Sequence, residues 1–199
     1  MKTRKKRRGF SLGEILVAVA IMAVIAAVVI PSIGGQLNKG ETGRVTSDLT
    51  NTRTAVEQFL ADVRRYPSTM LQLQTKPLAA TAADTGANAT GTFSAAQVSR
   101  WKGPYMSKDF SVAAVTGYGA SMVVLFRVCD ISTNTLTSCS APVVTGRYLT
   151  IAIPGLTSAE ALEIDNAMDD GVLTTGQIRW IAKGAGPADT LRYLALPIQ

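Results

Sequence analysis

The spacing of hydrophobic and polar positions changes along the chain and gives three successive patterns. Residues 15–30 are apolar without a break, and no charged residue occurs from position 15 to position 38. In the second pattern, mostly apolar positions recur at alternating steps of four and three: Val45, Leu49, Thr52, Val56, Phe59 and Val63. Such steps place side chains on one face of a helix. The third pattern, in the C-terminal half, consists of short strand-like runs.

The first two patterns together predict one long helix over residues 10–64. We expect it to end before Pro67, because the residue preceding a proline is disfavoured in the α-helical conformation. Its uncharged stretch of 24 residues is about 36 Å long as a helix, enough to cross a hydrocarbon core of about 30 Å. The stripe of the second pattern is the seam on which a globular domain packs.

The C-terminal half predicts strands at residues 122–129, 147–153, 177–183 and 191–196. A helix over residues 158–168 is expected among them. Thr157 and Glu160 have the spacing of a capping box at its start, and Gly171 is a typical stop after its end. The fold class is therefore α+β, with the C-terminal half of the long helix packed on an antiparallel β-sheet.

The net charge of +6 is concentrated at the N-terminus. Six of the twenty basic residues are among the first eight, and from Gly9 onward fourteen basic residues balance fourteen acidic ones. No basic stripe with interleaved aromatic residues follows, so we expect no nucleic-acid binding. A basic cluster before a membrane-spanning segment instead indicates a cytoplasmic N-terminus, with the bulk of the chain on the other side.

The residue types limit the chemistry that the chain can perform. It has no histidine, which removes Ser-His-Asp and Cys-His systems and the commonest general base, while carboxylate or lysine chemistry stays open. Cys129 and Cys139 are the only cysteines, too few for a tetrahedral metal site. In an exported domain they would form a disulfide worth about 3 kcal/mol, whereas in the cytosol they would be two separate thiols.

Glu14 is unexplained by the ordinary interpretations of this N-terminal segment. A carboxylate within a membrane segment costs about 2.5–3.5 kcal/mol on insertion scales. A secretory signal peptide cleaved after Ala26 or Ala27 is one alternative, although its apolar run is usually shorter. A plain signal anchor is the other. Neither gives Glu14 a role.

The stretch from Gly9 to Glu14, Gly-Phe-Ser-Leu-Gly-Glu, resembles the prepilin motif of type IV pilins and type II secretion pseudopilins. The resemblance implies cleavage between Gly9 and Phe10 by a prepilin peptidase, N-methylation of Phe10, and retention of Glu14 as the fifth mature residue. Pro31 stands at the twenty-second mature position, where the family has a proline that bends or locally melts the helix. The chain departs from the family at Gly13, where aliphatic residues are commoner.

The same resemblance implies a partner for Glu14. Cleavage leaves a positively charged amine on Phe10, and N-methylation keeps it charged. In a helical filament, Glu14 of one subunit meets the Phe10 amine of a neighbour, so that neither charge is buried alone. The implied partners are other copies of the chain, the prepilin peptidase, an inner-membrane assembly platform, and minor pilins or pseudopilins.

The middle of the chain is similar to the major pseudopilin of type II secretion. Residues 65–69, Arg-Tyr-Pro-Ser-Thr, and residues 101–105, Trp-Lys-Gly-Pro-Tyr, carry this similarity. The chain then departs from that subfamily, because it lacks the Asp-Pro-Trp-Gly-Asn-Pro turn and the acidic calcium-binding loop near the C-terminus. A type II secretion pseudopilus and a type IV pilus therefore both stay open.

Residues 165–171, Asp-Asn-Ala-Met-Asp-Asp-Gly, form the one acidic cluster in the sequence. The spacing fails the EF-hand pattern, because Ala167 stands where an oxygen ligand is needed. It is more typical of a helix end. We therefore expect no metal and no cofactor, with calcium at this cluster as the alternative.

These observations divide the chain into five parts. Residues 1–9 are the leader, 10–33 the transmembrane and filament-core half of the helix, 34–65 its amphipathic half, 66–120 a connecting region and 121–199 the sheet domain. We expect a structural subunit and not an enzyme, held in the bacterial cytoplasmic membrane with its globular domain outside the cytoplasm, and later in a periplasmic or extracellular filament. The alternative is a secreted or membrane-anchored binding module, or a His-free enzyme, with an ordinary signal sequence.

Overall fold

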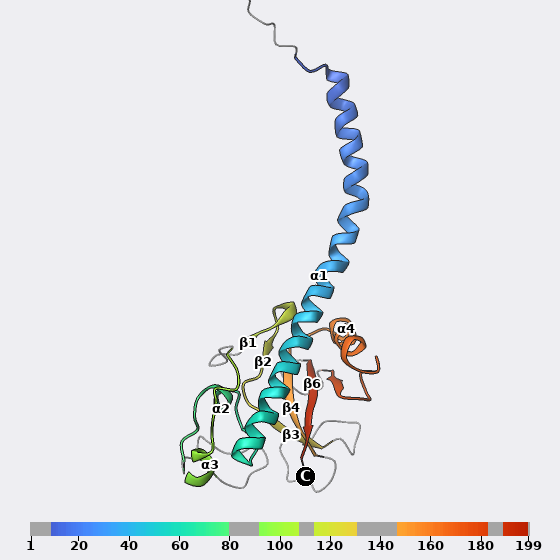
Figure 1. The fold of residues 1–199 in the computed structure, drawn as a ribbon. Helices are drawn as coiled ribbons and strands as arrows, with labels where there is room; N and C mark the ends of the chain where they lie inside the picture. Colours follow the sequence, from blue (N-terminus) through green and yellow to red (C-terminus); the bar gives the residue numbers. More distant parts are fainter. Residues whose placement is uncertain (1–8, 80–91, 108–113, 131–146, 183–188, 199) are drawn as a thin grey trace, which may run out of the picture. The chain divides into compact units, whose positions relative to one another are not determined.

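The computed structural model describes residues 9–79, 92–107, 114–130, 147–182 and 189–198. It has an α+β fold, with an N-terminal apolar helix followed by short helices and a small antiparallel sheet (Figure 1). This confirms the predicted fold class and is consistent with a pilin-like fold. The chain forms two compact units, residues 1–39 and 40–199.

The first unit contains the start of helix α1, which spans Leu12–Val63. The helix begins two residues later than predicted, because the hydroxyl of Ser11 accepts a hydrogen bond from the helical N–H of Glu14 and so caps the helix. The backbone is helical through Pro31. The side chains of residues 30–37 are not among those described, and the bend at Pro31 stays a prediction.

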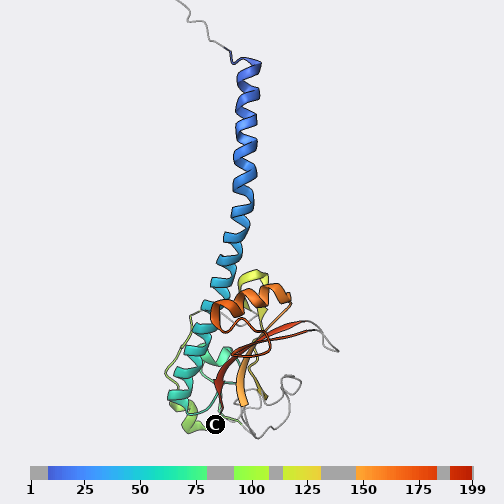
Figure 2. The same cartoon turned by 90° about the vertical axis from the view of Figure 1, so that its right-hand side faces the viewer.

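The second half of α1 forms one wall of the core of the second unit. All six positions of the predicted stripe are fully buried: Val45, Leu49, Thr52, Val56, Phe59 and Val63. Figure 2 shows this half of the helix running alongside the sheet. On its flank, Arg53 donates hydrogen bonds to the Gln177 amide oxygen at 3.3 Å and the Tyr193 hydroxyl at 3.4 Å. The helical stripe is thus confirmed as a packing seam.

The sheet consists of four antiparallel strands in the order β3-β4-β6-β5. Their bounds are Arg127–Asp130 for β3, Arg147–Pro154 for β4, Ile178–Ile181 for β5 and Thr190–Pro197 for β6. Ile151, Ile178 and Leu191 are fully buried in the cluster that the α1 stripe also joins. Three of the predicted strands are confirmed, although β5 is shorter than predicted: residues 177 and 182 are described but lie outside the strand, and residue 183 is not described.

The fourth predicted strand, at residues 122–129, is wrong as a single element. The chain instead forms β2, Ser121–Met122, and then β3 after a break of four residues. β2 pairs with β1, Ala114–Val115, in a separate two-stranded sheet. The apolar run therefore contributes strands to two different sheets: β2 to the two-stranded sheet and β3 to the four-stranded sheet.

Main-chain hydrogen bonds explain this break. The Val124 carbonyl accepts a hydrogen bond from the Met70 N–H at 2.9 Å, and the Phe126 N–H donates to the Ser68 carbonyl at 3.0 Å. The backbone between β2 and β3 therefore pairs with a segment that is distant in the sequence. Such pairing is a tertiary contact that local periodicity does not encode.

Helix α4 spans Ser158–Met168, as predicted, and begins with the predicted capping box. The Glu160 N–H donates to the Thr157 hydroxyl at 3.3 Å, and the Thr157 N–H donates to the Glu160 carboxylate at 2.7 Å. The helix ends at the C-cap residue Asp169, and Gly171 has a φ of 75°, a conformation that favours glycine. The predicted helix end at the acidic cluster is confirmed.

The described parts of residues 66–120 contain short elements: α2 (Leu71–Gln74), α3 (Ala95–Ser99), β1 and the 3-10 turn η1 (Gly117–Gly119). An aromatic cluster packs this region against the end of α1. The Phe59 ring makes edge-to-face contacts with Phe93 and Tyr105, at centroid distances of 6.0 and 5.7 Å. Trp101 contacts Tyr105 in the same way at 5.7 Å, and the Tyr105 hydroxyl donates to Asp62 at 3.0 Å.

We expect Phe59→Ala to lower the free energy of unfolding by about 3–5 kcal/mol, because it leaves a cavity in this buried cluster. Urea unfolding followed by tryptophan fluorescence measures the loss, since Trp101 lies in the cluster. The exposed neighbour Gln58 provides the control, and Gln58→Ala should change stability by less than about 0.5 kcal/mol. Similar losses in the two variants would contradict the placement of Phe59 in the core.

Candidate functional site

The candidate site residues lie at the start of α1. Gly9 and Phe10 precede the helix, and Phe10 is 84% exposed. Glu14 is in the first helical turn and is also exposed. A Cβ atom at Gly9 would meet no atom within 4 Å, so the fold of this chain does not itself require glycine there. Residues 1–8 of the predicted leader lie outside the described residues.

Glu14 belongs to a capping box that the sequence analysis did not identify. The Ser11 N–H donates to Glu14 Oε2 at 2.8 Å, and the Glu14 N–H donates to Ser11 Oγ at 3.2 Å. The spacing Ser-x-x-Glu before an apolar run is the sequence signature of this motif, so it was available in the sequence. Glu14 therefore orients the start of the helix in the free chain, in addition to any role between chains.

Every residue of the apolar part of the helix beyond this cap, from Leu12 to Val29, is exposed. The window Leu12–Val29 has a mean hydropathy of 2.7, and none of it is buried. By length and composition this window is long and apolar enough to cross a membrane. It contains one ionisable side chain, Glu14.

The charge of Glu14 is not balanced by an ion pair with any described residue. The ion pairs found in the described parts of the chain join Arg53 to Glu57 at 3.0 Å and Lys102 to Asp62 at 3.2 Å, both in the second unit. A carboxylate on an exposed apolar helix can hold a cation supplied by another molecule. This arrangement suits recognition between chains.

Cys129 is buried in β3 and is not a free thiol. Its sulfur lies 3.2 Å from the Thr150 hydroxyl and 3.7 Å from a guanidinium nitrogen of Arg192. Cys139 lies outside the described residues. A bridge between Cys129 and Cys139 therefore stays a prediction.

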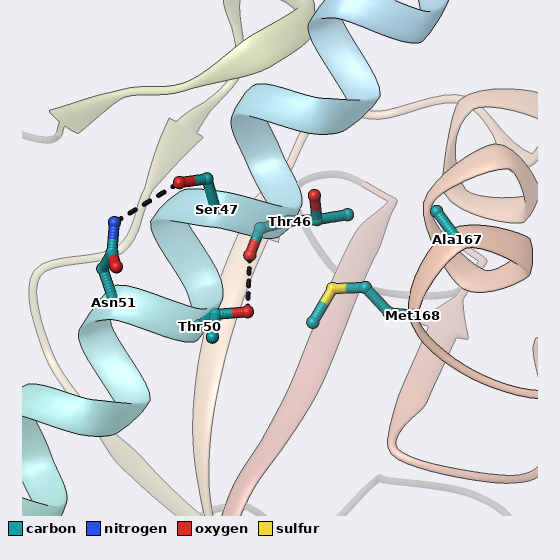
Figure 3. A pocket seen from close by; sticks show the side chains of 6 residues that line it. All are labelled: Thr46, Ser47, Thr50, Asn51, Ala167 and Met168. Atoms are coloured by element: carbon teal, nitrogen blue, oxygen red, sulfur yellow. Dashed lines mark hydrogen bonds between the residues drawn. The ribbon is translucent and has the colours of Figure 1, made fainter.

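A groove of about 460 Å³ lies between α1 and α4 in the second unit (Figure 3). Its lining residues are Thr46, Ser47, Thr50, Asn51, Ala167 and Met168. Two of the polar groups bond within α1 itself: the Thr50 hydroxyl donates to the Thr46 carbonyl at 2.8 Å, and the Asn51 amide to the Ser47 hydroxyl at 3.4 Å. None of the six side chains is an acid or a base, so the groove presents no general acid–base pair.

The N-terminal segment carries the similarity to a known family. A family model described as the prokaryotic N-terminal methylation motif matches residues 4–30. That range contains Gly9, Phe10, Glu14 and the start of the apolar helix. The resemblance to the type IV pilin and pseudopilin family is thereby confirmed at the N-terminus.

Comparison with curated proteins identifies particular relatives. The chain is 38% identical over 77 residues to the type II secretion system core protein G of Klebsiella michiganensis, a match that covers 37% of this chain and 54% of that protein. It is 36% identical over 75 residues to the core protein G of Pectobacterium carotovorum, covering 36% and 48%. The fimbrial protein EcpB of Eikenella corrodens is 38% identical over 56 residues, covering 28% and 35%.

The chain thus spans about half the length of the core G proteins that it matches. Their names describe a component of a secretion system, and that of EcpB a component of fimbriae. No solved structure shows a significant match.

Proposed function

We propose that this protein is a structural, non-enzymatic subunit of a pilus-like filament, made as a precursor and shortened before assembly. One observation carries this function: no residue of the apolar helical segment Leu12–Val29 is buried, and the segment holds a carboxylate, Glu14, in its first turn. The methylation motif at residues 4–30 and the similarity to core G proteins and a fimbrial protein support it.

The exposed helix needs an apolar environment outside the chain. Each Å² of apolar surface removed from water contributes about 25 cal/mol, so the helix is first stabilised in a bilayer. A bilayer offers nothing to Glu14, whose charge is costly there. Packing against other copies of the same helix provides an equally apolar environment and, in addition, a cation for the carboxylate.

That cation is the N-terminal amine created by prepilin peptidase between Gly9 and Phe10. The amine of Phe10 in one subunit pairs with Glu14 of a neighbour, so two groups that are costly to bury singly are buried together. The same cut removes the six basic residues of the leader. If retained, these charges would have to enter the filament core unpaired.

The basic leader places the N-terminus in the cytoplasm. The helix then lies in the bacterial cytoplasmic membrane, and residues 40–199 lie outside the cytoplasm. Assembly moves the subunit into a periplasmic or extracellular filament. The partners are other copies of this chain, prepilin peptidase, an inner-membrane assembly platform, and minor pilins or pseudopilins.

Residues 101–105 favour a secretion pseudopilus over a surface pilus. This segment resembles the major pseudopilin, and Tyr105 packs on Phe59 near the end of α1 while Trp101 packs on Tyr105. Electron microscopy and mass spectrometry of filaments sheared from cells separate the two forms. Abundant surface filaments made of this protein would favour the pilus.

The mass of the mature protein tests the proposed processing. Purified from membranes, the chain should begin at Phe10 and carry one N-terminal methyl group, which tandem mass spectrometry of the N-terminal peptide detects. A mature chain that begins after Ala26 or Ala27 would instead support an ordinary secretory signal and contradict the proposed class. An intact leader in a host that has prepilin peptidase would also contradict it.

A further inference from the structure

Three carboxylates meet where α4 ends. Asp165 lies in the last turns of α4, and Asp169 and Asp170 follow the helix. One oxygen atom of each residue lies within 4.8 Å of the corresponding oxygens of the other two. Asp165 has no exposed surface (0%), Asp169 is half-buried and Asp170 is exposed. The cluster therefore has a buried floor and an open side.

Both carboxylate oxygens of Asp165 are buried and have no hydrogen-bond partner among the described residues. A buried polar group without a partner is unfavourable, and a charged one much more so. Burial and the nearby charges of Asp169 and Asp170 raise the pKa of Asp165 to about 6, while Arg179 acts in the opposite direction. Arg179 supplies one positive charge against three carboxylates.

The loop after α4 fixes the positions of the other two carboxylates. Asp169 Oδ2 accepts hydrogen bonds from the main-chain N–H groups of Gln177 and Ile178. Asp170 accepts from the Val172 N–H at 2.9 Å and the Thr175 hydroxyl at 2.6 Å. These donors orient the two side chains but supply no formal positive charge.

Glycine is required where this loop passes closest to Asp169. Gly176 has a φ of 68°, and a Cβ atom there would collide with the Asp169 carboxylate. The main chain can therefore wrap around the carboxylate only without a side chain at this position. The acidic groups are held together by the fold and do not merely lie near one another on a surface.

We propose that Asp165, Asp169 and Asp170 form a calcium-binding site. A cation at the centre of the cluster satisfies the buried Asp165 oxygens and offsets the repulsion among the three carboxylates. Oxygens that share one Ca²⁺ at 2.3–2.6 Å lie at most about 5 Å apart, which accommodates the observed spacing. The open side leaves room for water ligands. This site is independent of the proposed filament assembly.

Calcium suits these donors better than magnesium. All three side chains offer oxygen atoms, and an irregular loop with carboxylates at unequal depth does not impose octahedral geometry. Ca²⁺ accepts irregular coordination, whereas Mg²⁺ requires a near-ideal octahedron at about 2.1 Å. Bound calcium would fasten the end of α4 to the loop that leads into β5.

Thermal unfolding of the detergent-solubilised full chain tests the site. Adding about 2 mM CaCl₂, above the roughly 0.1–1 mM dissociation constants of extracellular calcium modules, should raise the melting temperature by roughly 3–5 °C. The same concentration of MgCl₂ should have little effect. Isothermal titration calorimetry with CaCl₂ should give one site per chain.

Two variants remove ligands, and a third serves as the matched control. Asp165→Asn and the exposed Asp170→Asn should each weaken calcium binding at least tenfold and abolish the thermal shift. Asp48→Asn, which removes a carboxylate of α1 that is not among the three clustered ones, should keep both calcium binding and the thermal shift. Because Asp170 is exposed, its variant tests the site even where Asp165→Asn does not fold. Absence of a calcium response in the unmodified chain, an equal response to magnesium, or a response retained in Asp170→Asn would each overturn the assignment.

Discussion

Replacing Glu14 with glutamine is expected to leave leader cleavage intact and to reduce filament yield about hundredfold. Glutamine keeps the capping box with Ser11, because it can still accept the Ser11 N–H, but it removes the negative charge. In the proposed filament, the Phe10 amine of the neighbouring subunit would then be buried without a counterion. Breaking a buried ion pair by removing one partner costs about 3–5 kcal/mol, and 3 kcal/mol corresponds to more than a hundredfold in an equilibrium.

The measurement is the amount of sheared or sedimented filament per cell, with total processed subunit determined by immunoblot. Ser11→Ala is the matched control, because it removes the capping hydroxyl at a cost of about 1 kcal/mol while keeping the charge. That variant should assemble. Filaments from Glu14→Gln at the normal level, with Ser11→Ala defective, would show that Glu14 acts as a helix cap and not as an assembly contact.

A second large effect is expected for Gly9→Val, which should abolish leader removal and therefore assembly. A valine at position 9 meets no steric obstacle within the chain, since a Cβ there has no neighbour within 4 Å. In the proposed processing, the requirement for glycine comes from the peptidase and not from the fold of the chain. Intact mass should show a chain longer by the nine leader residues and without the N-methyl group.

Gly13→Ala is the appropriate comparison for Gly9→Val. A Cβ at Gly13 would lie 4.0 Å from the Ser11 hydroxyl, an ordinary contact, and alanine favours the helix. This variant should be cleaved and assembled normally. If Gly9→Val is cleaved as efficiently as the unmodified chain, the site of cleavage is not between Gly9 and Phe10.

The parts of the fold that the sequence predicts correctly are those that local periodicity encodes. The stripe from Val45 to Val63 is buried as expected, because a period near 3.6 leaves one face of a helix for the core. The strands β4 and β6 lie at the centre of the sheet and are long enough to show a clear apolar run.

The prediction was wrong where tertiary contacts override such a run. Val124 and Phe126 belong to an apolar stretch, yet their backbone groups pair with residues 68–70. Nothing in the spacing of residues 122–129 distinguishes this arrangement from one continuous strand. Which backbone segments pair with one another in β-structure depends on the whole fold, so the spacing of residues in one sequence does not predict the pairing.

The two candidate sites differ in the same way: one is encoded locally in the sequence, and the other depends on tertiary packing. Gly9, Phe10 and Glu14 are recognisable because they form a linear motif, which a family model matches within residues 4–30. The acidic residues at the end of α4 were also visible, but the sequence cannot show that Asp165 is fully buried with unpartnered oxygens. Burial arises from packing between elements, and only the structure supplies it.

The capping box at Ser11 has a consequence for the entropy of assembly. A glutamate side chain that becomes fixed on binding loses rotamer freedom worth up to about 1.5–2 kcal/mol. Here the hydrogen bond from Ser11 already selects one arrangement of Glu14 in the free chain. In the proposed assembly, an incoming subunit would therefore meet a preorganised carboxylate, and less of the attraction between charges would be lost to ordering the side chain.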